Sequence, residues 1–322
     1  MTAVPAGGRR AAPTAEPTAD PTADREVTAV EASLDLGRPV IGDPVLTVRD
    51  LTIDYLVAEP VHAVKAATFE LRQGEILGLA GESGCGKTTL AYGLNQLHRP
   101  PAAITAGSVI FHDADSGRDI DVLALAGKEL RSFRWSKVSM VFQGAMNSLN
   151  PVISVRAQLT DVIATHRPEL GREDRLRRAE ELLELVGVDP RRITSFAHEL
   201  SGGMRQRVMI AMALALDPQL MIMDEPTTAL DVVVQREILQ EILRLRQELG
   251  FAVVFITHDL PLLLEISDRI AVMRGGEIVE LATAEDLYFE PRHDYTRTLL
   301  SSFPSLTGET GDFVRAGYQE RS

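Results

Sequence analysis

The sequence contains a single cysteine, Cys85, among its 322 residues. One thiol excludes a disulfide framework or a multi-cysteine metal site within the chain, and it favours a reducing compartment. Basic residues are also few, because 33 Lys and Arg stand against 46 Asp and Glu and give a formal net charge of -13. Nucleic-acid phosphates are bound by clustered Lys and Arg, so this balance argues against nucleic acid as a partner.

Long apolar runs are absent as well. The longest, residues 208–216, covers nine positions, whereas a helix needs about 20 residues to cross a bilayer. The first residues also lack the apolar core of a signal peptide. We therefore expect a cytoplasmic protein that reaches a membrane only through a partner.

The first 43 residues differ in composition from the rest of the chain. They are rich in Ala, Pro and Thr, and they contain the repeat PTAE-PTAD-PTAD over residues 13–24. Such a segment has too little apolar surface to offset the entropy of ordering. We predict a disordered N-terminal tail over residues 1–43 that takes no part in a core.

The following residues alternate between strand-like and helix-like patterns. Apolar and polar side chains alternate over residues 51–55 and 67–72, which favours half-buried antiparallel strands. Helical spacing of leucine and isoleucine occurs over residues 90–97 and 238–249. Three continuous apolar stretches are typical of fully buried strands, and they are residues 75–80, 220–223 and 251–256. Strands that alternate with helices predict an α/β fold, with a mostly parallel sheet and helices on both faces.

Two further segments complete this outline. Residues 154–201 hold no convincing strand, but apolar side chains recur at helical spacing near residues 176–186, which predicts a helical insertion. Residues 269–281 have the pattern of a hairpin that turns at Gly275 and Gly276.

Residues 81–89, GESGCGKTT, match the pattern of a phosphate-binding loop placed between a buried strand and an amphipathic helix. Glycines let backbone N–H groups point inward around an anion, and the helix N-terminus adds partial positive charge. We expect Lys87 to reach the β- and γ-phosphates, Thr88 to bind Mg²⁺ and Thr89 to hydrogen-bond a phosphate oxygen. The alternative, a glycine-rich turn matched by chance, is disfavoured by the flanking strand and helix. The predicted nucleotide-binding residues of the loop are Gly81, Glu82, Ser83, Gly84, Cys85, Gly86, Lys87, Thr88 and Thr89.

Residues 220–231, LMIMDEPTTALD, deliver two acids at the end of a buried strand. Ligands of open α/β sheets collect at the carboxyl ends of the strands. We expect Asp224 to hold Mg²⁺ and Glu225 to orient or deprotonate an attacking water. Paired acids at a strand end are often only solvated or helix-capping, but the phosphate loop favours the catalytic interpretation.

Residues 200–207, LSGGMRQR, resemble the signature sequence of ATP-binding cassette (ABC) ATPases. The resemblance implies an ABC ATPase fold over residues 44–287, in which a P-loop parallel-sheet core carries an antiparallel β subdomain and a helical subdomain over about 144–205. It also implies ATP and Mg²⁺ as cofactors and a head-to-tail dimer with a second ABC ATPase subunit. In that dimer Ser201, Gly202 and Gly203 of one subunit would meet the γ-phosphate held by the other.

The same resemblance implies roles for four other residues. His258 matches the family's switch histidine at the γ-phosphate, and Asp231 matches a loop that lies across the dimer interface. Gln143 would reach Mg²⁺ and the γ-phosphate, and the rigid turn after it, residues 144–151, would carry that signal to the helical subdomain. Tyr55 is the candidate aromatic that stacks on adenine, although an ordinary strand aromatic is the alternative. A lone histidine after a strand is more often structural, but the spacing of His258 behind Glu225 favours the switch role.

The wording of several segments is similar to one branch of the family, the ATP-binding subunits of bacterial dipeptide and oligopeptide importers. The segments are GESGCGKTT, FQGAMNSLNP, HELSGGMRQR and PRHDYTRTLL, the last of which falls in a C-terminal extension over residues 288–322 and has Asp294 where a proline is common. This branch implies two integral membrane permease subunits, an extracytoplasmic solute-binding protein and a peripheral place on the cytoplasmic face of the cell membrane. Relatives in this branch also transport nickel or oligosaccharides, so the substrate stays open. The ATPase partner can be identical or different, so the identity of the dimer partner stays open as well.

A second hypothesis is a soluble ABC ATPase that acts on ribosomes or DNA. Translation-type members usually carry two cassettes in one chain, and repair-type members carry a long coiled-coil insertion; this chain has one cassette and no such insertion. A P-loop GTPase is a third option, but no N-K-x-D string is present.

Overall fold

The computed structural model describes residues 41–144, 148–228 and 230–302. The predicted N-terminal tail therefore lies almost wholly outside the described residues, and so do Ala145, Met146 and Asn147 of the predicted rigid turn. In the described ranges, no helix is both long enough and apolar enough to cross a membrane.

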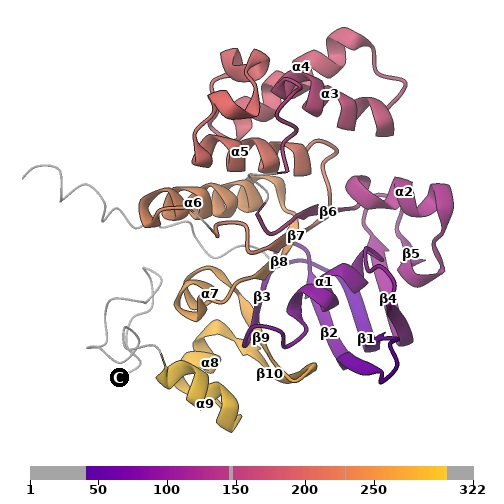
Figure 1. Cartoon of the computed structure of the whole chain (residues 1–322), viewed down its shortest axis with the longest axis vertical. Helices are drawn as coiled ribbons and strands as arrows, with labels where there is room; N and C mark the ends of the chain where they lie inside the picture. The colour runs from indigo at the N-terminus through magenta and orange to yellow at the C-terminus, as the bar shows by residue number, and fades with distance from the viewer. Residues whose placement is uncertain (1–40, 145–147, 229, 303–322) are drawn as a thin grey trace, which may run out of the picture. The chain divides into compact units, whose positions relative to one another are not determined.

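Ten strands and nine α-helices are found in the described ranges, and Figure 1 shows their arrangement. The strands are β1 (Pro44–Tyr55), β2 (Val61–Arg72), β3 (Ile76–Ala80), β4 (Ala102–Asp113), β5 (Arg118–Asp121), β6 (Val138–Val141), β7 (Leu220–Asp224), β8 (Ala252–Ile256), β9 (Arg269–Arg274) and β10 (Glu277–Thr283). The helices are α1 (Lys87–Leu94), α2 (Gly127–Ser136), α3 (Val155–His166), α4 (Arg172–Leu185), α5 (Gly202–Ala213), α6 (Val232–Leu249), α7 (Leu260–Ile266), α8 (Ala284–Phe289) and α9 (Asp294–Ser301).

The larger sheet has the strand order β10-β9-β3-β8-β7-β6, and every neighbouring pair except β9 with β10 is parallel. All residues of β3, β7 and β8 are buried, as their continuous apolar stretches predict. Val141 of β6 lies opposite Met223 of β7, and Met223 lies opposite Phe255 of β8. The carboxyl ends of these three strands are therefore level, so the residues that follow them meet at one edge of the sheet.

The smaller sheet is antiparallel, with the order β2-β1-β4-β5. The antiparallel pair of β1 and β2 confirms the strands that the alternating apolar and polar side chains predict. The long strand β4 was not predicted, because its middle residues are exposed and its apolar positions alternate only near its C-terminal end. The described structure thus contains an antiparallel sheet that is wider than its sequence pattern indicates.

The helices α3, α4 and α5 lie together at the top of Figure 1, above α6, and form the helical part of the chain. Ser154 begins α3 by accepting a hydrogen bond from the N–H of Ala157, and Leu159, Leu183 and Val208 pack into a common core. The predicted helices over residues 154–201 and 238–249 are confirmed, and Gly250 ends α6 with a φ of 74°. The predicted helix over residues 90–97 ends earlier than expected, because α1 stops at Leu94.

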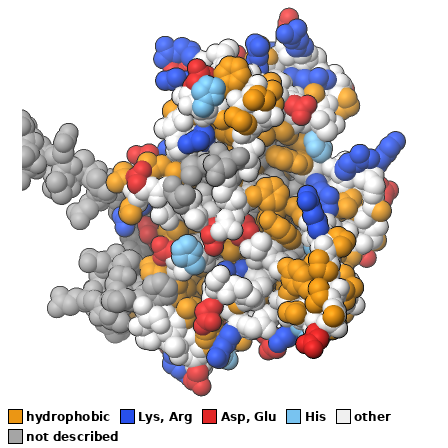
Figure 2. All heavy atoms as spheres, in the orientation of Figure 1, with side chains coloured by type: hydrophobic (Ala, Val, Ile, Leu, Met, Phe, Trp, Pro, Cys, Tyr) orange, Lys and Arg blue, Asp and Glu red, His pale blue; other side chains and the backbone are white. Residues whose placement is uncertain are grey.

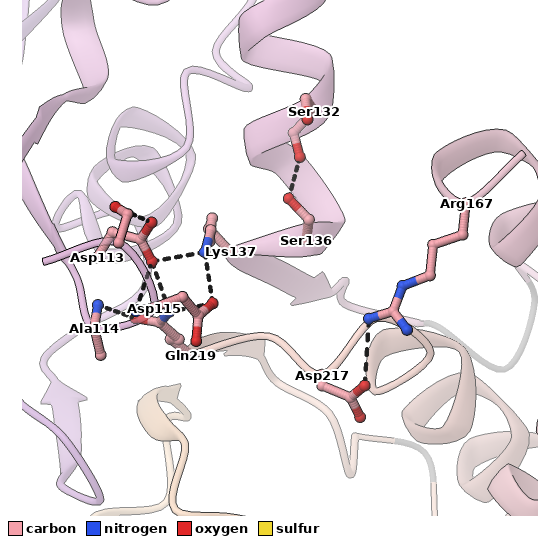
Figure 3. A network of polar contacts seen from close by, with 10 residues as sticks. Asp113, Ala114, Asp115, Ser132, Ser136, Lys137, Arg167, Asp217 and Gln219 are labelled. Atoms are coloured by element: carbon pink, nitrogen blue, oxygen red, sulfur yellow. Dashed lines mark hydrogen bonds and ion pairs between the residues drawn. The ribbon is translucent and has the colours of Figure 1, made fainter. Parts of the chain in front are cut away.

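The segment from Asp217 to Gln219, just before β7, joins three parts of the fold (Figure 3). Lys137 directly precedes β6, and its Nζ lies 2.6 Å from Asp113 Oδ1 and 2.7 Å from Asp115 Oδ2, where the chain leaves β4. Gln219 Nε2 donates to the same two carboxylates at 2.8 and 2.9 Å. On the other side, Asp217 accepts hydrogen bonds from Arg167, which directly follows α3, and from Arg178 of α4. These polar contacts tie the helical part and the antiparallel sheet to the start of β7.

The Lys137–Asp113 pair predicts a specific acid sensitivity. Burial alone would raise the pKa of Asp113, but hydrogen bonds from Lys137, Ser116 and Gln219 outweigh it and lower the pKa to about 2. A lowered native pKa stabilises the fold above the unfolded value of about 3.9, and this stabilisation is lost as the pH falls towards about 2. We expect Lys137→Met to reduce the free energy of unfolding by about 2 kcal/mol at pH 7, and the difference to shrink below about pH 4.

Urea unfolding of the two proteins between pH 7 and pH 2.5 measures this difference. Lys128→Met is the matched control, because Lys128 is an exposed residue of α2. A Lys137→Met deficit that stays constant down to the lowest pH would contradict the assignment.

Candidate active site

The loop between β3 and α1 is shaped by glycines in the left-handed region of φ. Gly81, Gly84 and Gly86 have φ values of 142°, 79° and 109°. A Cβ on Gly81 would lie 2.2 Å from the carbonyl oxygen of Met273, and one on Gly86 would lie 2.3 Å from that of Ala63. Both close contacts are with backbone atoms, which cannot rotate away. Glycine is therefore required at Gly81 and Gly86 for sterics as well as for φ.

Lys87 begins α1, and its ammonium group lies at the centre of the loop. Its Nζ donates hydrogen bonds to the carbonyl oxygens of Gly81, at 2.8 Å, and Glu82, at 2.9 Å. Gly86 precedes the helix and has no side chain to cap the first N–H groups of α1. A buried ammonium beside uncapped N–H groups forms a site for an anion such as phosphate.

Asp224, the last residue of β7, faces the start of α1. Thr88 Oγ1 donates to Asp224 Oδ1 at 3.2 Å, whereas Asp224 Oδ2 is buried and has no hydrogen-bond partner in the described part of the chain. Burial raises the pKa of Asp224, the charge of Glu225 adds to this effect, and the contacts with Thr88 and Lys87 oppose it. An unpartnered buried carboxylate oxygen beside a hydroxyl fits a small cation with oxygen ligands, of which Mg²⁺ is one.

Glu225 follows Asp224 but turns away from the strand, with a φ of 47°. Its N–H donates to the carbonyl oxygen of Ile256 at 2.9 Å. Its carboxylate accepts hydrogen bonds from Gln143 Nε2 at 2.8 Å and from Thr228 Oγ1 at 3.1 Å, and His258 Nδ1 lies 3.5 Å from its other oxygen. Groups that follow β6, β7 and β8 therefore converge on one carboxylate, as the level strand ends require.

Thr228 is a site residue that sequence reasoning missed. Its hydroxyl holds the same Glu225 oxygen as Gln143 does, Oε2, which leaves Oε1 facing His258. The turn Pro-Thr-Thr after Glu225 is visible in the sequence, but a local pattern does not indicate which threonine folds back. His258 is 70% exposed, so its ring can reach groups outside this cluster.

Tyr55, at the end of β1, lines a cleft of about 480 Å³ together with Tyr92, Leu97 and Phe142. The Tyr55 hydroxyl and Thr89 Oγ1 are 3.3 Å apart, so the cleft opens beside the first turn of α1. Leu56, Val57 and Val61, between the end of β1 and the start of β2, are exposed apolar side chains. Figure 2 shows apolar side chains gathered over this part of the antiparallel sheet. A flat aromatic group bound next to the phosphate loop would find an apolar wall here.

Ser201 and Asp231 begin neighbouring helices. Ser201 accepts the N–H of Met204 at the start of α5, and Asp231 accepts the N–H of Val234 at the start of α6. Gly203 lets the two helices approach, because a Cβ there would lie 2.7 Å from Val234 Cγ1. Gly202 is the first residue of α5.

The structure thus separates the predicted site residues into two groups. Among the described residues, no hydrogen bond or ion pair joins the group of Ser201, Gly202, Gly203 and Asp231 to the phosphate loop or to Glu225. The group around the phosphate loop is connected by contacts of its own, which run from Tyr55 to Thr89, from Thr88 to Asp224 and from Gln143 to Glu225.

The chain matches the family model described as ABC transporter over residues 64–228, and the one described as the C-terminal region of oligopeptide/dipeptide transporters over residues 279–321. The oligopeptide transport ATP-binding protein OppD of Bacillus subtilis is 42% identical over 265 residues, which cover 81% of this chain and 72% of that protein. The dipeptide transport ATP-binding protein DppD of the same organism is 38% identical over 268 residues, which cover 82% and 78%. A solved dimeric ATP-binding cassette bound to ADP and Pi has a TM-score of 0.63 and 29% identity, over 74% of this chain and 98% of that chain.

Proposed function

Because the chain belongs to the ABC transporter family, we propose that it is the ATP-hydrolysing subunit of an importer for dipeptides or oligopeptides. The observation that carries the ATPase assignment is the convergence of Gln143, Glu225 and His258 beside the phosphate loop. The peptide assignment is supported by the names of the relatives and by the match of residues 279–321 to the C-terminal region of oligopeptide and dipeptide transporters.

In this proposal the phosphate loop binds the triphosphate of ATP. The N–H groups at the start of α1 and the Lys87 ammonium face the phosphates, and adenine stacks on Tyr55 in the neighbouring cleft. Thr88, Asp224 and Gln143 would hold Mg²⁺, which the unpartnered Asp224 Oδ2 supports. When bound, Mg²⁺ neutralises charge on the β- and γ-phosphates.

Glu225 is the proposed general base for the attacking water. Gln143 and Thr228 donate to one of its oxygens, which fixes the direction of the other towards His258. A carboxylate held in this way accepts a proton from water without first reorienting. His258 is exposed and its Nδ1 lies 3.5 Å from Glu225 Oε1, and in this proposal it contacts the γ-phosphate.

A head-to-tail dimer with a second ABC ATPase subunit completes the proposed site. The N-terminus of α5, capped by Ser201, carries partial positive charge that suits the γ-phosphate held by the partner subunit. Val232 and Val233, next to Asp231, are 71% and 65% exposed, so apolar surface is available at the same edge. The dimeric state of the similar cassette bound to ADP and Pi supports a dimer; the head-to-tail arrangement is part of the proposal.

The remaining predictions concern partners and organisation. Two integral membrane permease subunits and an extracytoplasmic solute-binding protein would complete the transporter, with this chain on the cytoplasmic face of the membrane. The cassette would occupy residues 44–287, with the helical subdomain over about 144–205 and the extension over 288–322. These boundaries and partners stay predictions.

Purification of the tagged full chain from the membranes of its host cell tests the proposal. We expect two integral membrane proteins to accompany it, and ATP hydrolysis by the reconstituted complex to rise severalfold with peptide and the solute-binding protein. Stimulation by nickel or an oligosaccharide instead of peptide would contradict the substrate. Co-purification with ribosomes or DNA, without membrane proteins, would contradict the importer and favour the soluble alternative.

A further inference from the structure

The C-terminal helix α9 contacts the phosphate loop directly. The Tyr295 hydroxyl accepts a hydrogen bond of 3.2 Å from the backbone N–H of Glu82. The carbonyl oxygen of Glu82 accepts from Lys87 Nζ at 2.9 Å. The Glu82 residue is therefore held through its N–H by the C-terminal helix and through its carbonyl oxygen by the lysine at the centre of the loop.

This contact falls on the part of the loop that has little other support. Glu82, Ser83 and Gly84 are exposed, and a Cβ on Gly84 would meet no atom within 4 Å. The opposite end of the loop is held by the β9–β10 hairpin, where the N–H of Gly276 donates to the carbonyl oxygen of Cys85 at 3.1 Å. Glu82, Ser83 and Gly84 form the exposed arc of the loop, and the Tyr295 hydroxyl holds this arc through the Glu82 N–H.

Tyr295 is itself fixed from two directions. Its ring is buried, and the guanidinium carbon of Arg274 lies 4.8 Å from the ring centroid. The start of α9 is held by Glu280 of β10, whose carboxylate accepts the N–H groups of Arg292, at 2.8 Å, and His293, at 3.0 Å. The hydroxyl is thus held beside Glu82 by burial of the ring, by Arg274 and by the contacts of Glu280 with the start of α9.

The Tyr295 hydroxyl stays neutral. Burial raises the pKa of Tyr295, the hydrogen bond from the Glu82 N–H opposes this, and the nearby Glu82 carboxylate raises the pKa further. A neutral hydroxyl accepts the Glu82 N–H and retains its own proton. The contact is therefore available at neutral pH.

We propose that Tyr295 is a positioning residue for nucleotide binding, which couples the C-terminal extension to the phosphate loop through the backbone of Glu82. This inference rests on the proposed function of the loop as the ATP site. Loss of the hydroxyl frees the Glu82 N–H, so the exposed arc and its contact with Lys87 occupy more conformations. Binding of the triphosphate must then order the loop again, which weakens the affinity for ATP. The groups around the attacking water are unchanged.

Tyr295→Phe in the full chain tests the proposal, because it removes the hydroxyl and retains the buried ring. We expect the Kd for a fluorescent ATP analogue to rise about 3- to 10-fold, the factor that corresponds to one net hydrogen bond. The KM for ATP should rise by a similar factor while kcat is retained, and amide hydrogen exchange at Glu82 should become faster. Tyr288→Phe is the matched control, since Tyr288 lies near the end of α8, where the same extension begins, and packs on Phe289.

The outcomes distinguish the role of Tyr295 from the proposed ATP site on which it depends. Unchanged Kd and unchanged Glu82 exchange in Tyr295→Phe, with binding lost in Lys87→Ala, would overturn the role of Tyr295 and leave the ATP site intact. Unchanged binding in Lys87→Ala would overturn the proposed ATP site itself. Equal losses in Tyr295→Phe and Tyr288→Phe would also overturn the role of Tyr295, because they would indicate general loosening of the extension.

Discussion

Replacement of Glu225 by Gln is expected to reduce ATP turnover by about 10²- to 10⁴-fold while leaving ATP binding intact, since this is the usual contribution of a general base. The substitution retains the shape of the side chain and an oxygen that accepts from Gln143 and Thr228. The backbone hydrogen bond from residue 225 to Ile256 is also unaffected. What disappears is the ability to accept a proton from water. With ATP bound and not hydrolysed, the variant should accumulate as a closed dimer.

Single-turnover hydrolysis and size-exclusion chromatography with ATP measure the two effects. Glu248→Gln is the matched control, because Glu248 lies at the exposed end of α6 and makes an ion pair with Arg244. Hydrolysis by Glu225→Gln at the rate of the wild type would remove Glu225 from its proposed role.

Replacement of Lys87 by Ala is expected to raise the Kd for nucleotide by about 10- to 100-fold, because hydrogen bonds to charged groups contribute about 1.5–3 kcal/mol each. The reason lies in the position of the ammonium, which is buried at the centre of the loop between the carbonyl oxygens of Gly81 and Glu82. Its removal takes away the positive charge that faces the phosphates and also frees those two carbonyl groups. The loop therefore loses both a positive charge and the two hydrogen bonds that hold its carbonyl groups.

Titration with a fluorescent ATP analogue measures this loss. Lys65→Ala is the matched control, because it removes the same charge from an exposed lysine whose partner is Glu277. Equal affinities in the two variants would show that net charge, rather than the position of Lys87, determines binding.

Local motifs indicate where the site residues lie in the fold, because each one combines a strand end with the residues that directly follow it. The comparisons confirm the predicted fold and the resemblance to ABC ATPases. The proximity of Gln143, Glu225 and His258 follows from the level carboxyl ends of the parallel strands β6, β7 and β8, of which the continuous apolar stretches indicate β7 and β8. The roles of the individual residues stay predictions.

Other features depend on contacts that no local pattern encodes. Tyr295 and Glu82 are 213 positions apart in the sequence, and the tyrosine occupies an ordinary helical position. The strand β4 escapes prediction because its exposed middle breaks the alternation. The polar contacts of Lys137, Asp217 and Gln219 link three separate parts of the chain, so their partners can be identified only once the fold is known.

The close approach of α5 and α6 at Gly203 and Val234 has a mechanical consequence. Ser201 and Asp231 begin these two helices. A substitution that enlarges residue 203 would place its side chain against Val234, so it would change the spacing between both helix starts rather than weaken one contact.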